Sequence, residues 1–324
     1  MLSRPLRFAL QSFVASSADD WRQKAKKAED LGYSTFHLAD HYIGPGPALE
    51  STGHPAQEVA AVPAIAVAAE ATSTIRVGCR VFCVDYHHPV VLAKEAATLD
   101  FFSGGRLELG LGAGWLRGEY EAMDVPYDPP LERIDRLAEL IEIVKGHSSG
   151  SLLSVEGQRW TVKGFSGLPS PIQKPHPPIM VGGGSKKVLQ LGAREADIVS
   201  LNFNNRAGMI GPDGIKTSTA EKTAHKISWI REAAGDRLAN MDIEIGAYFT
   251  VVTDQADAAA SAMAGNFGIS PEEMKRHPHA LMGSVDEICD EILRRREEYG
   301  INYVTVSDGN LEPFAPVVAR LSGS

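Results

Sequence analysis

Residues 104–115 read Gly-Gly-Arg-Leu-Glu-Leu-Gly-Leu-Gly-Ala-Gly-Trp, and this stretch indicates how the chain folds. It begins as a turn and continues as a strand, because Leu107, Leu109 and Leu111 alternate with period two. It ends in Gly112-Ala113-Gly114, where small residues let the backbone adopt unusual angles and let a flat ligand approach it. A tight turn that needed only small residues would have the same sequence. The neighbouring segments therefore decide between a plain turn and a ligand-binding strand end.

Short apolar strands alternate with helical segments along the 324 residues. This alternation predicts a parallel α/β sheet, and eight strand–helix units close into a (β/α)8 TIM barrel. An open doubly wound sheet is the alternative. We therefore predict one barrel domain over residues 1–324. The predicted strands cover residues 6–13, 35–39, 75–84, 107–114, 179–182, 198–203, 243–253 and 303–306, and the predicted helices cover 19–31, 55–72, 89–101, 131–145, 185–194, 217–234, 255–266, 284–299 and 311–321.

Two segments interrupt the alternation. Residues 147–178 contain a short hairpin pattern and a proline-rich run, which predict an insertion in the barrel. Residues 268–283 predict an extra helical segment. The glycine- and proline-rich loop 43–53 and the insertion are expected to shape the mouth of the substrate pocket, because loops carry specificity on a rigid barrel.

Composition excludes several classes of partner. A net charge of -9 disfavours nucleic acid and anionic membranes as the main partner. No apolar run approaches the roughly 18 residues of a membrane helix, and the first residues do not resemble a secretory signal. Three cysteines fit a reducing compartment, and Cys79 and Cys83 lack partners at metal-ligand spacing. We therefore expect a cytoplasmic protein that acts on a small molecule and holds no metal.

In a barrel, the active site lies at the carboxyl ends of the strands, and Asp40-His41 follows the second predicted strand. Imidazole exchanges protons near neutral pH, and a neighbouring carboxylate would favour the protonated ring or fix its tautomer. Equally, Asp40 can cap the following loop while His41 packs, and the sequence leaves both open. Phe13 and Phe203, near two other strand ends, are candidates for the substrate pocket or for the core.

A second candidate site is Gly182-Gly183-Gly184, between a predicted strand and a predicted helix. Backbone N–H groups at such a helix amino terminus suit a phosphate, although a flexible turn would have the same sequence. The pairs His87-His88 and His277/His279 are interpreted as loop residues without a role in the site.

Taken in order, these motifs resemble the luciferase-like (bacterial luciferase superfamily) oxidoreductases. Within that superfamily the chain is similar to the branch that uses coenzyme F420, an 8-hydroxy-5-deazaflavin. The resemblance extends over nearly the whole chain. Its motifs lie at residues 38–41, 75–78, 88–100, 103–106, 109–115 with Glu119-Tyr120, 177–184 and 191–197.

The resemblance implies a barrel with an insertion, a homodimer, and a non-prolyl cis peptide at the end of the third strand, by position Arg80-Val81. It also implies that His41 acts as the acid or base, with Asp40 beside it. The residues it implies around the cofactor ring are Asp40, Arg80, Val81, Gly112, Ala113, Gly114 and Trp115, and those around the phosphate are Gly182, Gly183 and Gly184.

The cofactor is either F420 or flavin mononucleotide (FMN). Monooxygenases of the desulfurisation type place a Trp-Asn-x-x-Thr motif after the Gly-Arg turn, whereas Arg106 is followed here by Leu-Glu-Leu-Gly-Leu-Gly-Ala-Gly. This favours an F420-dependent oxidoreductase that transfers hydride. An FMN-dependent luciferase-like monooxygenase and a non-catalytic flavin-binding protein are the alternatives. A lysine and arginine cluster for a sugar phosphate is not evident at the carboxyl-terminal strands, so a C=C, C=O or C=N group in an apolar molecule is the expected substrate.

Overall fold

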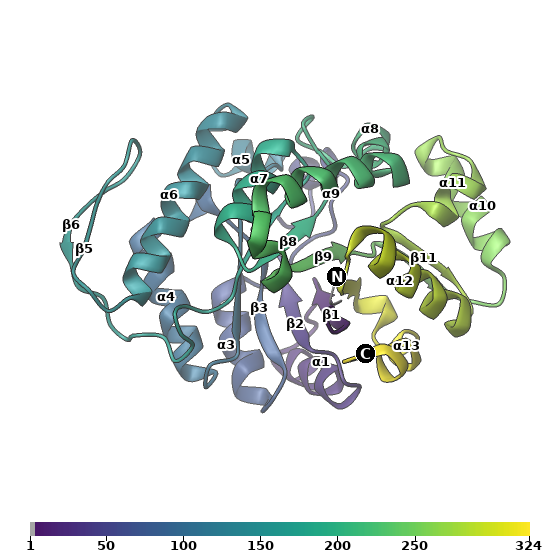
Figure 1. Ribbon diagram of the computed structural model, residues 1–324, viewed down its shortest axis with the longest axis horizontal. Helices are drawn as coiled ribbons and strands as arrows, with labels where there is room; N and C mark the ends of the chain where they lie inside the picture. Colours follow the sequence, from purple (N-terminus) through teal and green to yellow (C-terminus); the bar gives the residue numbers. More distant parts are fainter. Residues whose placement is uncertain (1–3) are drawn as a thin grey trace.

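A closed barrel of eight parallel strands forms the centre of the computed structural model, which describes residues 4–324 (Figure 1). Around the barrel the strands follow the order β1-β12-β9-β8-β7-β4-β3-β2. This closure confirms the predicted (β/α)8 fold and excludes the open doubly wound sheet. The barrel strands are β1 (Arg7–Ser12), β2 (Thr35–Leu38), β3 (Arg76–Cys83), β4 (Leu107–Gly112), β7 (Ile179–Gly183), β8 (Ile198–Leu201), β9 (Asp242–Gly246) and β12 (Tyr303–Ser307).

Helices surround the barrel, and one face of each strand packs against them. Leu107, Leu109 and Leu111 of β4 are fully buried in the same apolar cluster as residues of the outer helices, so the period-two leucines point outward. The surrounding helices are α1 (Ala18–Asp30), α3 (Ala61–Ala71), α4 (Pro89–Phe102), α6 (Pro130–Ser148), α7 (Lys186–Glu195), α9 (Ala220–Ala234), α12 (Val285–Tyr299) and α13 (Ala315–Leu321). Helix α3 begins six residues later than predicted, which puts Pro63 in its first turn. Proline is tolerated there because the N–H that it lacks would have no hydrogen-bond partner within the helix.

The other face of β4 points into the barrel, where Glu108 forms a buried polar cluster. Its carboxylate accepts hydrogen bonds from Tyr303 Oη at 2.8 Å, His37 Nε2 at 3.1 Å and an Arg7 guanidinium nitrogen at 2.8 Å. Because these partners come from β12, β2 and β1, the cluster ties β4 to strands that are not its neighbours.

The insertion contains the predicted hairpin, formed by antiparallel strands β5 (Leu153–Glu156) and β6 (Thr161–Phe165). The hairpin and the pair α10 (Ala256–Phe267) and α11 (Pro271–Arg276) lie at opposite ends of the molecule in Figure 1.

Two predicted elements are wrong in their extent. The strand expected over residues 243–253 breaks after Gly246, and β10 (Phe249–Val252) leaves the barrel to pair with β11 (Ala280–Gly283). The helical segment expected over residues 268–283 therefore ends in a strand. The reason is Pro278, which disfavours helical angles at His277, so α11 stops at Arg276.

Shorter elements lie in the loops between these units. They are α2 (Pro47–Glu50), α5 (Arg117–Ala122), α8 (Pro212–Ile215) and the 3-10 turns η1 (Val84–Tyr86), η2 (Lys216–Ser218), η3 (Gly235–Asn240) and η4 (Asp308–Asn310). Within residues 4–324, none of the helices combines the length and apolar character needed to span a membrane.

Replacing Gly114 by alanine is expected to destabilise the fold by more than the roughly 1–2 kcal/mol that a left-handed backbone costs an ordinary residue. Gly114 has φ +71°, and an added Cβ would also overlap the Tyr120 hydroxyl. Gly104 is a matched control, because it has φ +69° and no atom within 4 Å of the added Cβ. Urea unfolding of both variants measures the difference, and equal losses of free energy would contradict the packing argument.

Candidate functional site

The carboxyl ends of β2, β3 and β4 converge on one side of the barrel, where His41 meets a buried carboxylate. His41 Nδ1 lies 2.7 Å from Glu119 Oε2, and the imidazole keeps 12% of its side-chain surface exposed while the Glu119 side chain is fully buried. Since the Glu119 carboxylate can only accept, Nδ1 carries the proton, and Nε2 is left to exchange a proton with a bound molecule.

Glu119 is held on the short helix α5 by two further donors. The Tyr42 backbone N–H reaches Oε1 at 2.5 Å and the Tyr86 hydroxyl reaches Oε2 at 3.0 Å. Burial acts to raise the pKa of Glu119, but the hydrogen bonds from His41, Tyr42 and Tyr86 outweigh it, and the net pKa is lowered. Glu119 is therefore an anion at neutral pH, so it accepts hydrogen bonds from all three donors.

Asp40 has a different partner from the one predicted. Its Oδ2 accepts from His87 Nε2 at 2.8 Å and from the Cys83 backbone N–H at 2.9 Å, whereas His41 pairs with Glu119. The interpretation of His87 as a loop residue outside the site is therefore wrong. In the described part of the chain, the buried Oδ1 of Asp40 has no hydrogen-bond partner, which leaves an acceptor for a ligand donor.

Aromatic rings line the space around His41. The His41 ring centroid lies 4.1 Å from that of His54 and 6.1 Å from that of Trp115, and Phe13 packs 5.7 Å from His54. His54 Nδ1 donates to the Pro55 carbonyl, and burial together with the nearby His41 lowers its pKa to about 3. His54 is therefore neutral at physiological pH.

The bottom of the site is formed by glycines that accommodate Val81. An added Cβ would lie 2.6 Å from a Val81 methyl at Gly112 and 3.1 Å from one at Gly182, so β3, β4 and β7 meet closely at this side chain. The peptide Arg80-Val81 is cis, as the family resemblance implied. The carbonyls of Ala113 and Gly114 accept from the buried Arg133 at 3.2 and 2.5 Å, which fixes the end of the glycine-rich turn.

The side chain of Arg80 is engaged by the protein itself. Its guanidinium donates to Glu244 at 3.0 Å, to Gln11 at 2.9 Å and to Tyr248 at 3.1 Å. The Arg80 guanidinium therefore has its hydrogen-bond partners within the protein, and Arg80 as a cofactor residue stays a prediction.

Phe203 belongs to a separate aromatic group. It is buried against His279 and Tyr248, with ring centroids 4.5 and 5.5 Å away, and the Tyr248 and His279 rings stack at 5.4 Å. His279 Nδ1 donates to the Gly246 carbonyl at 2.7 Å, and burial lowers the pKa of His279. His277 and His279 lie in the loop between α11 and β11, as interpreted from the sequence, and both side chains are buried in this group.

Gly182, Gly183 and Gly184 lie at the end of β7, as predicted, and adjoin a cavity of about 300 Å³. An added Cβ at Gly184 would overlap the backbone of Phe203, so only glycine fits there. The N-cap of α7, Ser185, makes no side-chain capping bond, so the first N–H groups of this helix lack the usual cap.

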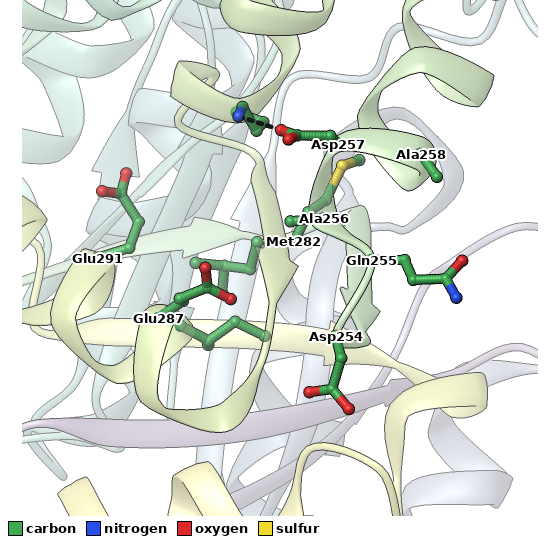
Figure 2. A pocket seen from close by; sticks show the side chains of 11 residues that line it. Asp254, Gln255, Ala256, Asp257, Ala258, Met282, Glu287 and Glu291 are labelled. Carbon is green, nitrogen blue, oxygen red and sulfur yellow. Dashed lines mark hydrogen bonds and ion pairs between the residues drawn. The ribbon is translucent and has the colours of Figure 1, made fainter.

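A larger cavity of about 660 Å³ lies outside the barrel, between β11, α10 and α12 (Figure 2). Figure 2 shows Asp254, Asp257, Glu287 and Glu291 lining it. Its one lysine, Lys275, is paired with Asp257 at 2.5 Å. Because carboxylates predominate, this cavity repels a phosphate-bearing cofactor, and it contains none of the predicted site residues.

The sequence analysis named Glu119 as part of a family motif but gave it no role, and it missed His54 and the partner of Asp40. Glu119 could have been found from its place four residues after Trp115, since a short helix there folds back over the end of β2. No local signal places His54 beside His41, because twelve residues, including helix α2, separate them.

Comparison with known proteins identifies one family, and the similar proteins within it use different cofactors. The family model described as luciferase-like monooxygenase matches residues 7–304. A segment of 121 residues is 33% identical to FMNH2-dependent dimethylsulfone monooxygenase of Pseudomonas putida; it covers 37% of this chain and 33% of that protein. The chain thus matches about a third of the length of this curated relative.

Solved structures agree in fold over the whole chain. The coenzyme F420-dependent tetrahydromethanopterin reductase of Methanopyrus kandleri has a TM-score of 0.77 at 17% identity, covering 98% of this chain and 100% of that one. An F420-dependent secondary alcohol dehydrogenase, in complex with an F420–acetone adduct, has a TM-score of 0.75 at 18% identity, covering 98% and 99%. At these identities the likeness concerns the fold alone.

Proposed function

Because this chain belongs to the luciferase-like monooxygenase family, an oxidoreductase family, we propose that it is a coenzyme F420-dependent oxidoreductase. When bound, the deazaflavin would supply or accept hydride at the ring carbon that replaces the flavin N5. The observation that carries the proposal is the His41–Glu119 pair at the barrel mouth, because every hydride transferred to a polar double bond requires a proton.

The residues around Asp40 fit a flavin-type ring. The unpartnered Oδ1 of Asp40 is a buried acceptor, and a flavin or deazaflavin brings ring N–H donors. Val81 and the flanking glycines Gly112 and Gly182 offer a smooth apolar surface on which a flat ring can lie. Ala113, Gly114 and Trp115 would border the ring, and the phosphate would lie toward Gly182–Gly184.

His41 is the proton carrier in this proposal. Glu119 holds the proton on Nδ1, so exchange with substrate takes place at Nε2. An anionic Glu119 stabilises the imidazolium that forms when His41 takes a proton during substrate oxidation, and in the reverse direction His41 gives that proton back.

The walls favour a substrate with an apolar body. Phe13, His54 and Trp115 border the space near His41, and His54 is uncharged at physiological pH. We propose that the substrate presents a C=C, C=O or C=N group there.

We also propose that the protein acts as a homodimer.

An FMN-dependent monooxygenase is the second candidate, and the likeness to the dimethylsulfone monooxygenase segment supports it. The two candidates differ in their use of oxygen. Reduced F420 with a panel of apolar ketones, enones and imines should be oxidised without oxygen, while reduced FMN should give no protein-dependent oxygen uptake with the same panel. Oxygen uptake that requires both the protein and one of these substrates would contradict the F420 proposal.

A further inference from the structure

The ring of Tyr248 lies over the open end of the barrel. Glu244 of β9 points into the barrel, where it accepts a hydrogen bond from Arg80, so Gly246, two residues further on, is on the same inward face. A Cβ added at Gly246 would lie 2.7 Å from Tyr248 Cζ, the carbon that carries the hydroxyl. The Tyr248 ring therefore folds back over the inward face of β9, and the residue remains partly exposed although the residues of β9 before it are buried.

The Tyr248 hydroxyl accepts one hydrogen bond and keeps its own proton free. A terminal nitrogen of the Arg80 guanidinium donates to Tyr248 Oη at 3.1 Å. A phenol hydroxyl can also donate, and within residues 4–324 it donates to no protein acceptor. Because Arg80 is a cation, its bond withdraws charge from the hydroxyl oxygen and strengthens the bond that the hydroxyl can donate. The proton is therefore available to a molecule bound in the mouth.

Neighbouring rings hold Tyr248 in this position. The His279 ring stacks on it at an interplanar angle of 11°, and Phe203 packs against it with ring centroids 5.5 Å apart. His279 in turn donates from Nδ1 to the Gly246 carbonyl at 2.7 Å. The strand end beneath Tyr248 thus also fixes the ring stacked on it, and a donor held in place in this way loses little freedom when a ligand binds.

The end of β1 links Tyr248 to the part of the mouth that contains His41. Gln11 accepts, at 2.9 Å, from the same guanidinium that bonds to Tyr248. Phe13 packs against His54, which packs against His41. Because Gln11 and Phe13 are two residues apart, about 7 Å of extended chain separates the two sets of contacts. The Tyr248 hydroxyl and the His41 imidazole therefore border one space of the size of a small molecule.

We propose that Tyr248 is a substrate-binding residue, whose hydroxyl donates a hydrogen bond to the oxygen or nitrogen of the substrate's C=O or C=N group. This inference rests on the proposed function and narrows its substrate class, because an isolated C=C group cannot accept the bond. When hydride reaches the carbon, the electron pair of the double bond moves to the heteroatom. A donor at that heteroatom stabilises the charge until the proton arrives from His41.

The test uses two probes of the same shape, cyclohexanone and methylenecyclohexane, which differ in a C=O against a C=CH2 group. Their binding to the protein loaded with oxidised F420, in which no hydride is available, is measured by equilibrium dialysis. Tyr248→Phe keeps the ring with its stacking and removes only the oxygen. It should weaken ketone binding about 3- to 10-fold, the effect of one hydrogen bond, and leave the binding of the alkene and of F420 unchanged.

Tyr33→Phe is the matched control. The Tyr33 ring is buried in the outer apolar cluster, and its hydroxyl donates to the carbonyls of Asn310 and Leu311 at 3.1 and 3.0 Å. This variant also loses a tyrosine hydroxyl, but it should bind both probes as the wild type does.

The outcomes separate this inference from the proposed function. Weaker binding of the ketone alone, in Tyr248→Phe alone, supports it. An unchanged ketone affinity, an equal loss for both probes, or a wild type that binds F420 but not the ketone overturns it and leaves the proposed function standing. Loss of F420 binding in Tyr248→Phe would assign the residue to the cofactor and overturn the substrate assignment. A wild-type protein that does not bind F420 overturns the proposed function and this inference with it.

Discussion

Replacing His41 by alanine is expected to lower kcat for hydride transfer by roughly 10²- to 10⁴-fold, the range that general acid–base catalysis contributes. In the proposed mechanism the imidazole carries the proton at the mouth, and its Nδ1 lies 2.7 Å from Glu119. The dissociation constant of the cofactor should change little, because the ring seat consists of Asp40, Val81 and the glycines. Steady-state rates with the reduced deazaflavin, together with cofactor titration, measure both quantities.

His88→Ala is the matched control for this variant, since His88 is exposed and packs against Trp160 of the insertion. It should keep the wild-type rate. Glu119→Gln should lower kcat as well, because an amide can also donate a hydrogen bond to Nδ1 and no longer fixes the tautomer of the His41 ring. A His41→Ala enzyme that turns over at the wild-type rate would remove the proton-transfer role.

Replacing Glu108 by glutamine is expected to destabilise the barrel by about 1–3 kcal/mol, the effect of weakening buried hydrogen bonds to a charged group. The change removes one of the two ion pairs of Arg7, which keeps Asp242 at 2.9 Å, and it weakens the bonds from His37 and Tyr303. Urea unfolding at neutral pH measures the loss. Glu195→Gln is the control. The Glu195 side chain is 45% exposed, so its ion pair with Lys145 should contribute less than about 1 kcal/mol to stability.

The Glu108 effect should depend on pH in a defined direction. Burial acts to raise the pKa of Glu108, but Arg7 and His37 outweigh it and hold the pKa well below its usual value. Its ionised form therefore stabilises the fold above the pKa of an unfolded glutamate, about 4.3, and this contribution is lost as the pH falls toward the folded pKa. The difference in stability between wild type and Glu108→Gln should narrow below about pH 4. A difference that stays constant between neutral and acid pH would contradict this account.

The sequence predicted the barrel because each strand carries a local signal. In β4 the alternating leucines mark the outward face, and the glycines at its end mark the mouth. Asp40 and His41 were found for the same reason, since both directly follow a strand and the ends of parallel strands share one edge.

What the sequence could not predict depends on contacts between distant segments. The partner of His41 lies 78 residues away, and the partner of Asp40 lies 47 residues away, so adjacency in sequence suggested the wrong pair. The exit of β10 from the barrel depends on pairing with β11, some thirty residues later, which no local pattern encodes. The burial of Lys226, which lowers the pKa of its amine to about 7, was also hidden, since a lysine on an amphipathic helix usually faces solvent.

An equilibrium titration compares the two candidate cofactors directly. The purified protein is titrated side by side with F420 and FMN while the fluorescence of each ligand is followed. We expect saturable F420 binding at micromolar concentration, at least about 10-fold tighter than FMN. Tighter binding of FMN, or no binding of F420, would contradict the proposed F420-dependent function.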